Sequence, residues 1–276
     1  MIAQSIPAER ASWNRPVEPF RIVGNIYYVG AQGLSAFLVT TPEGNILLDG
    51  GFPETAPLIE KSISRLGFRL RDVKFLLNSH AHYDHCGGLT ELKKRSGARM
   101  VASEADSRVS NGGRELNSSD REHSFPPVEV DRIIADNETI RLGEAVLTAH
   151  LTPGHTKGCT TWTMPAAAGD KTYQVVFYCS TTVAGNRLVN NREYRAIASD
   201  YEQTFAKLRH LPCDVFLAPH GSQFHLDDKR AASQRGRKDA FADRAELQKY
   251  VSESERDIRW ELARQQASAR THSVLP

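Results

Sequence analysis

Several features that would define a functional class are scarce or missing in this 276-residue sequence. Four cysteines are too few for a disulfide scaffold. Lys and Arg (35) nearly balance Asp and Glu (33), and no basic block contains interleaved aromatic residues, which argues against nucleic-acid binding. Because no apolar run approaches the ~20 residues of a membrane span, we expect no membrane insertion either.

The first residues lack another recognisable signal. The start MIAQSIPAERASW has no basic region followed by an apolar one, so it does not read as a secretory signal peptide. A cytoplasmic protein and a mature exported protein with an initiator Met would look alike here. Residues 1–18 are rich in Pro, Arg and Ser and predict an N-terminal surface arm with Trp13 as its anchor, and residues 19–276 predict a single domain.

The nucleophile motifs of serine hydrolases are also absent, since the sequence contains neither G-x-S-x-G nor S-x-x-K. What it does contain is a polar turn directly after the apolar run Val73–Leu77, which predicts a strand, and this turn carries His80, His82, Asp84 and His85. Imidazole and carboxylate groups suit Zn²⁺, and a turn at the end of a buried strand holds them rigidly. A polar turn that happens to contain histidines is the alternative, but this spacing favours a metal site.

Apolar runs and turn residues predict the order of the elements. Strands are expected at 20–23, 26–29, 34–40, 45–48, 73–77, 128–134, 138–142, 145–151 and 215–217, and helices at 53–66, 89–95 and 200–208, the last capped by Asp200. The polar stretch 104–127 predicts an insertion or long loop. His155 and His220 each follow an expected strand, as the first cluster does, so all of them would lie on one rim of a two-sheet core. This arrangement predicts an α+β fold, a four-layer αββα sandwich.

Two cysteines fall on a predicted hairpin that turns at 166–171. Pairing Met164 with Gln174 would set Cys159 opposite Cys179, with the ~4.5 to 5.5 Å between Cα atoms that a disulfide can bridge. We raise a Cys159–Cys179 disulfide as a hypothesis. Two small buried thiols are the alternative.

At this point a family resemblance is visible. The chain resembles the metallo-β-lactamases over most of residues 13–226, in the segments PFRIVGNIYYVGAQGLSAFLVTTPEGNILLDGG, HAHYDHCGG, PGHTKGCTTWT, FYCSTTVAGNRLV and the Pro-His pair at 219–220. The His-x-His-x-Asp-His turn marks only the wider superfamily. The other segments resemble the third subclass, in which the second zinc ion is held by Asp and two His without Cys.

The resemblance implies two Zn²⁺ ions per chain. The first ion would be held by three histidines, His80, His82 and His155. The second would be held by an acid and two histidines, Asp84, His85 and His220. Asp49, an acid at the end of an apolar strand, is expected either to orient one of these histidines or to be a solvated turn residue.

The implied activity is zinc-dependent hydrolysis of the β-lactam amide bond of penicillins, cephalosporins or carbapenems by a zinc-bound hydroxide. Asp84 would be the catalytic residue, which orients the hydroxide or accepts a proton. Such a β-lactamase would give antibiotic resistance, and we expect a periplasmic monomer whose disulfide suits an oxidising compartment. By resemblance, Ser180 and Thr182 would bind the substrate carboxylate, although ordinary strand-end hydroxyls are the alternative. Asn186 and Arg187 would line the cleft, and Arg187 would add a charge-assisted contact.

Another hydrolase of the same fold, acting on a lactone or a thioester, is the alternative function. Such relatives resemble one another in a bridging aspartate at the end of the FYCST strand, where this chain has Cys179-Ser180 and no carboxylate. The first subclass places a Cys ligand in this region, but Ser180 takes the ligand's place in the third-subclass match and Cys179 is expected to face Cys159. A non-catalytic zinc-binding protein is a third interpretation, against which the open position left by three histidines argues.

Overall fold

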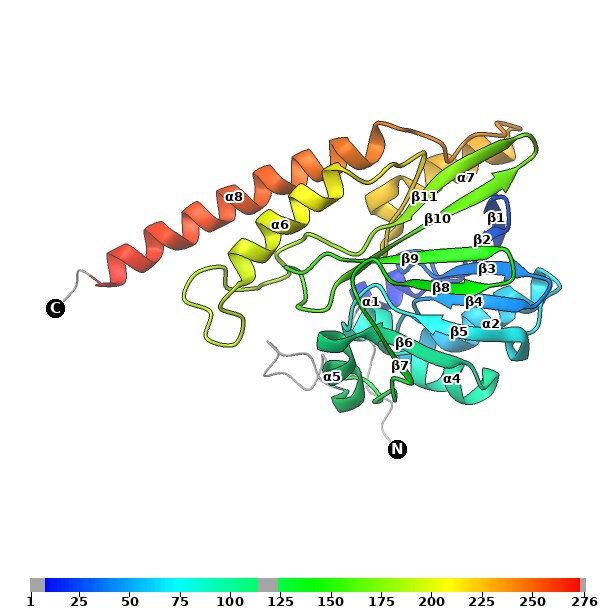
Figure 1. The fold of residues 1–276 in the computed structure, drawn as a ribbon, viewed down its shortest axis with the longest axis horizontal. Helices are drawn as coiled ribbons and strands as arrows, with labels where there is room; N and C mark the ends of the chain where they lie inside the picture. Colours follow the sequence, from blue (N-terminus) through cyan, green and yellow to red (C-terminus); the bar gives the residue numbers. More distant parts are fainter. Residues whose placement is uncertain (1–7, 114–123, 274–276) are drawn as a thin grey trace.

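The computed structural model describes residues 8–113 and 124–273, which form two mixed sheets flanked by helices (Figure 1). In the seven-stranded sheet the spatial order is β1-β2-β3-β4-β5-β6-β7: Phe20–Val23, Ile26–Tyr28, Phe37–Thr41, Gly44–Leu48, Val73–Leu77, Arg99–Ser103 and Arg132–Ile134. In the five-stranded sheet the order is β12-β11-β10-β9-β8: Val215–Leu217, Lys171–Phe177, Thr160–Ala168, Ala145–Leu151 and Thr139–Leu142.

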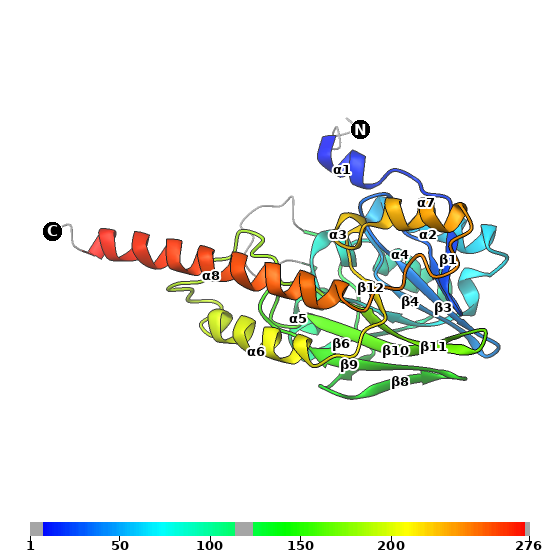
Figure 2. The same ribbon diagram turned by 90° about the horizontal axis from the view of Figure 1, so that it is seen from above.

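The α-helices of the described residues cover the outer faces of the sheets and the edge between them (Figure 2). They are α1 Ala8–Trp13, α2 Ala56–Arg65, α3 Tyr83–Cys86, α4 Leu89–Ser96, α5 Glu104–Gly112, α6 Ile197–Arg209, α7 Leu226–Gln234 and α8 Glu246–Ser273. No helix among these residues is long and apolar enough to cross a membrane.

Alternation along the strands divides the core into two layers. In β3, Leu38 joins the apolar cluster under α2 and α4, whereas its neighbour Phe37 joins the cluster between the sheets, because successive side chains of a strand point to opposite faces. In β4, Leu47 and Leu48 divide in the same way. Apolar residues of α6 and α8 also belong to the cluster between the sheets, which they cover on the outer side of the five-stranded sheet. The predicted four-layer αββα sandwich is therefore confirmed.

The hairpin of β10 and β11 has a different register from the one expected. Met164 pairs with Val175 and Pro165 with Gln174, a shift of one residue. The cause is the turn, which is shorter than the expected one: Ala168 pairs with Lys171, so only Gly169 and Asp170 connect the strands, and Gly169 has a φ of 62° that a glycine adopts without strain.

Cys159 and Cys179 are joined by a disulfide in spite of this shift. Their Cα atoms lie 5.9 Å apart. Both cysteines lie beyond the last pair of the hairpin ladder, Trp162 with Phe177: Cys159 precedes Trp162 and Cys179 follows Phe177, so the ladder does not fix their relative position. A disulfide sulfur has no thiolate to offer a metal, which removes Cys179 as a ligand.

Two other expectations about elements are wrong. Residues 104–112 of the expected long loop form the helix α5, which the Ser103 side chain caps by accepting a hydrogen bond from the Asp106 backbone N–H; residues 114–123 lie outside the described part. Helix α6 begins at Ile197, before Asp200, and its N-cap Ala196 makes no side-chain cap. Ile197 is buried in the core, so packing sets this helix start rather than a polar cap.

The N-terminal segment lies across the edge of the sheets where β5 and β12 end. Residues 1–7 of the expected arm are outside the described part, and residues 8–13 form α1. The Trp13 ring stacks near Phe52, with centroids 6.5 Å apart, and meets the His220 ring edge-on at 5.2 Å. Helix α8 begins near α7, runs alongside α6 and extends well beyond the sheets (Figures 1 and 2).

Candidate metal centre

Strands from both sheets deliver polar residues to one edge. Strands β4 and β5 are parallel, and so are β11 and β12, so the residues that follow each pair emerge side by side. His80 comes three residues after β5, His155 four residues after β9 and His220 three residues after β12. The expected convergence of these residues on one rim is therefore observed.

The turn after β5 is pressed against the loop after β4. Gly88 donates its N–H to the Gly51 carbonyl at 3.0 Å, and a Cβ atom on Gly88 would lie only 2.2 Å from the Gly50 carbonyl oxygen. This position therefore accepts only glycine. The close approach places Asp49, which follows β4, directly beside the histidine turn.

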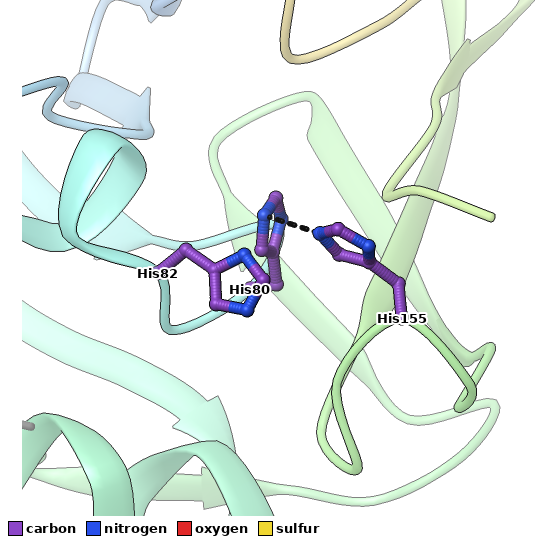
Figure 3. A group of neighbouring side chains, drawn as sticks. All are labelled: His80, His82 and His155. Atoms are coloured by element: carbon purple, nitrogen blue, oxygen red, sulfur yellow. Dashed lines mark hydrogen bonds between the residues drawn. The ribbon is translucent and has the colours of Figure 1, made fainter. Parts of the chain in front are cut away.

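The three histidines expected at the first zinc site form a compact group (Figure 3). Their ring centroids are 4.5 to 4.7 Å apart, and one ligand atom from each lies within 4.8 Å of the others. The Nε2 atoms of His80 and His155 face each other at 3.1 Å. Nitrogens bound to one tetrahedral zinc ion at ~2.0 Å are roughly 3.3 Å apart, so the spacing fits such an ion.

Hydrogen bonds at the outer ring nitrogens show why this group needs a cation. His155 Nδ1 lies 2.8 Å from the Thr182 carbonyl oxygen, which can only accept, so Nδ1 carries the hydrogen. Ser79 Oγ donates to Asp49 at 2.8 Å and therefore accepts from His80 Nδ1 at 2.9 Å. In the neutral rings both facing Nε2 atoms then hold lone pairs, which repel each other unless a positive ion lies between them. The residues fit a bound zinc ion.

The second group surrounds one carboxylate oxygen. Asp84 Oδ2 lies 3.3 Å from His85 Nε2 and 3.6 Å from His220 Nε2. His220 donates its Nδ1 hydrogen to the Gly33 carbonyl at 3.0 Å, so its Nε2 also presents a lone pair. The rings of His80 and His85 are 4.3 Å apart, which makes the two groups neighbours.

Asp49 is buried and supports both groups. Its Oδ1 accepts from the Ser79 backbone N–H at 2.7 Å and its Oδ2 from Ser79 Oγ, while His85 Nδ1 lies 3.7 Å from Oδ2. The residue has a φ of 65°, a strained backbone conformation that persists where the surroundings enforce it. The position contradicts the solvated-turn alternative and agrees with a role in orienting His80 and His85.

Burial and mutual repulsion keep His80, His155 and His220 neutral. Burial lowers the pKa of His80 well below its usual value and lowers the pKa of His155 and of His220 to about 4. Burial opposes ionisation of Asp84, but the nearby histidines, His85 foremost, hold the pKa of that carboxyl well below its usual range. Neutral imidazole and ionised carboxylate are the forms that bind metals.

Asp106, in the first turn of α5, ties the two ligand loops together. Its carboxylate accepts from Asn78 Nδ2 at 3.3 Å and Thr156 Oγ1 at 3.2 Å, and also from the backbone N–H groups of Ala81 and Gly158. Burial raises its pKa to about 7. A Cβ atom on Gly158 would lie 2.3 Å from Asp106 Oδ1. The loop carrying His80 and the loop carrying His155 are thus fixed through one side chain.

Sequence reasoning missed Asp106 because it lies in the polar stretch that was expected to be a loop. A signal was present, since Ser103-x-x-Asp106 matches the pattern of a helix N-terminus. This pattern predicts the start of the helix, but it does not predict which groups the Asp106 carboxylate contacts.

Three of the four residues expected to bind substrate lie around His155. Ser180 is buried, with its Oγ 3.2 Å from Thr182 Oγ1, and Thr182 Oγ1 is 3.1 Å from His155 Nδ1. Asn186 is buried and donates its Nδ2 hydrogen to the His155 carbonyl at 3.0 Å. Arg187 is exposed and, with Asn186, lines a surface hollow of about 950 Å³ whose lining includes none of the six expected metal ligands.

The comparisons with known proteins agree with this geometry. The sequence profile of the Metallo-beta-lactamase superfamily matches residues 29–220. The chain is 40% identical to BJP-1, a subclass B3 metallo-beta-lactamase of Bradyrhizobium japonicum, with a TM-score of 0.90 over 94% of this chain and 98% of that one. It is 39% identical to FEZ-1 metallo-beta-lactamase from Legionella gormanii, with a TM-score of 0.89 over 91% and 98% of the two chains.

Curated relatives are more distant and are matched over shorter segments. A hydroxyacylglutathione hydrolase from Jannaschia sp. is 27% identical over 197 residues, which are 71% of this chain and 65% of that protein. One from Bradyrhizobium sp. is 28% identical over 120 residues, which are 44% of this chain and 39% of that protein.

Proposed function

The chain belongs to the metallo-β-lactamase superfamily, where it groups with subclass B3, and we propose that it hydrolyses the β-lactam amide bond of penicillins, cephalosporins or carbapenems. The observation that carries the proposal is the convergence of the six expected ligands at one edge of the sheets. Ser180 stands at the strand end where, by resemblance, hydrolases acting on thioesters have an aspartate. The similarity to two metallo-β-lactamases over nearly their whole lengths supports it.

Two zinc ions are the proposed cofactors. The first would be held by His80, His82 and His155, and the second by Asp84, His85 and His220. When bound, zinc ions acidify a coordinated water towards a pKa of ~7 and polarise the carbonyl under attack, so no protein nucleophile is needed.

Asp84 is the proposed catalytic residue among the ligands. Its Oδ2 already faces two histidines, and their influence keeps the carboxyl ionised. An ionised carboxylate can orient the attacking water through one oxygen, accept its proton during the attack and pass that proton to the amide nitrogen as the C–N bond breaks. Asp49 and Ser79 hold the His80 ring in the tautomer that leaves Nε2 available.

Ser180, Thr182 and Arg187 are the proposed contacts to the substrate carboxylate. The two hydroxyls lie beside His155, and Arg187 would add a charge-assisted hydrogen bond at the cleft edge. Asn186 has a different proposed role, because its side-chain amide binds the His155 carbonyl and so holds the ligand loop.

Thioester hydrolysis is the second candidate, since curated relatives of this chain are hydroxyacylglutathione hydrolases. The Cys179-Ser180 pair argues against it: Cys179 is in a disulfide and Ser180 carries no carboxylate. Parallel assays with a penicillin, a carbapenem, an acyl lactone and a glutathione thioester separate the two functions. Turnover of the thioester without turnover of either β-lactam would contradict the proposal.

Periplasmic action as a monomer, giving antibiotic resistance, completes the proposal. The Cys159–Cys179 disulfide supports an oxidising compartment. Expression in a susceptible bacterium, with the protein either directed to the periplasm or retained in the cytoplasm, tests this part: the minimum inhibitory concentration of a carbapenem should rise only when the protein is exported.

A further inference from the structure

Helix α8 reaches well past the core on which it begins. Its first turns are anchored by the buried residues Leu247, Val251 and Ile258, and it packs along α6. Further along, the helix passes the loop between β11 and α6, and in both views that loop lies alongside it (Figures 1 and 2). At this crossing the side-chain amide of Gln265 contacts the loop.

Gln265 uses both ends of its amide on the loop. Its Oε1 accepts from the Leu188 backbone N–H at 2.7 Å and from the Val189 N–H at 3.3 Å. Its Nε2 donates to the Asn186 carbonyl at 3.2 Å and to Glu261 Oε1, one turn earlier on α8, at 2.8 Å. A donor and an acceptor fixed in one plane therefore match three backbone groups of the loop, a geometry that an apolar or a charged side chain cannot reproduce.

The same loop also contacts His155, one of the proposed zinc ligands. Asn186, whose carbonyl accepts from Gln265, donates its side-chain hydrogen to the His155 carbonyl at 3.0 Å. Upstream, Thr182 accepts from His155 Nδ1. One short segment thus connects the remote helix to a proposed zinc ligand and carries Arg187 between the two attachments.

The backbone of this segment adopts a conformation that contacts from outside the segment have to stabilise. Ala184 has a φ of 47° and Asn190 a φ of 54°, both in the left-handed region that non-glycine residues rarely adopt. Conformations of this kind persist only where surrounding contacts over-determine them. The backbone groups that Gln265 binds lie between these two residues in the sequence.

We propose that Gln265 is a positioning residue that fixes the loop 184–191 and thereby sets how tightly the enzyme binds its substrate. The inference rests on the proposed β-lactamase function, because it assigns the loop to the substrate side of His155. Without the amide, the loop and Arg187 sample more conformations, and substrate binding has to order them again.

The test replaces Gln265 with methionine, which has nearly the same volume but no amide, and uses Gln266→Met on the exposed neighbouring position as the matched control. Hydrogen exchange of the Leu188 and Val189 amides, KM and kcat with a penicillin and a carbapenem, and zinc content are measured for both. For Gln265→Met we expect at least tenfold faster exchange of the two amides and a KM raised about tenfold, with kcat changed less. A tenfold change in KM corresponds to the loss of one or two net hydrogen bonds. Zinc content and the control should match the wild type.

Unchanged exchange at Leu188 and Val189 would show that Gln265 does not hold the loop and would overturn the proposal. Faster exchange with an unchanged KM would overturn it as well, because the loop would then be held without consequence for binding. Failure of the proposed function is a distinct result: the wild type itself would not hydrolyse β-lactams, while the exchange measurement would still report the Gln265 contacts.

Discussion

The Nε2 atoms of His80 and His155 face each other at 3.1 Å, although the two residues are 75 positions apart and follow strands of different sheets. Each ring is fixed by a hydrogen bond at Nδ1, His80 through Ser79 and Asp49, and His155 through Thr182. Two inward lone pairs at this distance are a strained arrangement without a cation and a favourable one with it. The fold therefore holds both rings in the tautomers that leave their inward nitrogens available to a metal ion.

Removal of a proposed zinc ligand should affect turnover far more than removal of a substrate hydroxyl. We expect His155→Ala to lower kcat/KM for a chromogenic cephalosporin by more than ~100-fold, because the metal supplies several kcal/mol of charge stabilisation. Ser180→Ala should lower it by about tenfold or less, the value of one neutral hydrogen bond. Replacement of the exposed His210 with Ala is the control. Near-normal turnover by His155→Ala would refute the ligand assignment.

Acid should destabilise the zinc-free protein through His220. Burial lowers the folded-state pKa of His220 from 6.5 to about 4, so the unfolded chain binds the extra proton between these values. Stability from the neutral ring is present above pH ~6.5 and is lost as the pH falls towards 4, by up to about 3 kcal/mol. Urea unfolding of the chelated wild type and of His220→Gln at pH 7.5 and 5.0 measures this difference. Equal losses of stability in both proteins would exclude the assigned shift.

Asp106→Asn should weaken metal binding at the first group more than at the second. The substituted amide presents a donor where the carboxylate accepts from four donors, so the loops of His80 and His155 lose their common support. A loss of 10- to 100-fold in zinc affinity is typical for such supporting residues. Competition with a chromogenic chelator resolves the two affinities, and Glu104→Gln on the exposed side of the same helix is the control. If both ions bind as in the wild type, Asp106 is not a support of the site.

The disulfide should contribute to stability without contributing to the chemistry. Cys159 and Cys179 are 20 positions apart, and closing a loop of that length is worth about 3 kcal/mol. We expect Cys159→Ser/Cys179→Ser to unfold at lower urea with kcat nearly unchanged, whereas Cys213→Ser should behave as the wild type. Under denaturing, non-reducing conditions a thiol reagent should count two free thiols, Cys86 and Cys213. A count of four would exclude the disulfide.

Much of the fold was predictable because its signals are local. The strands Val73–Leu77, Ala145–Leu151 and Val215–Leu217 have the bounds that their apolar runs predict. The histidine turn was equally visible, since four candidate ligands lie within six positions of the sequence. The resemblance to the third subclass is confirmed by the superfamily profile and the B3 structures.

The parts that were not predictable depend on contacts between distant segments. The hairpin register followed a two-residue turn that composition alone did not reveal, and the start of α6 followed the burial of Ile197. Asp106 and Gln265 form hydrogen bonds with backbone groups 25 to 80 residues away, such as those of Ala81 and Leu188. Every residue has such backbone groups, so the residue types in the sequence do not indicate which of them will be bound. Only the folded chain identifies such partners.

The central claim is that two zinc ions at the histidine edge drive β-lactam hydrolysis, and it is tested most directly by metal analysis combined with carbapenem hydrolysis before and after chelation. We predict close to two zinc ions per chain, loss of activity when they are removed and recovery when zinc is restored. Full carbapenem hydrolysis by the metal-free protein, or a zinc-loaded protein with no activity towards any β-lactam, would contradict the account.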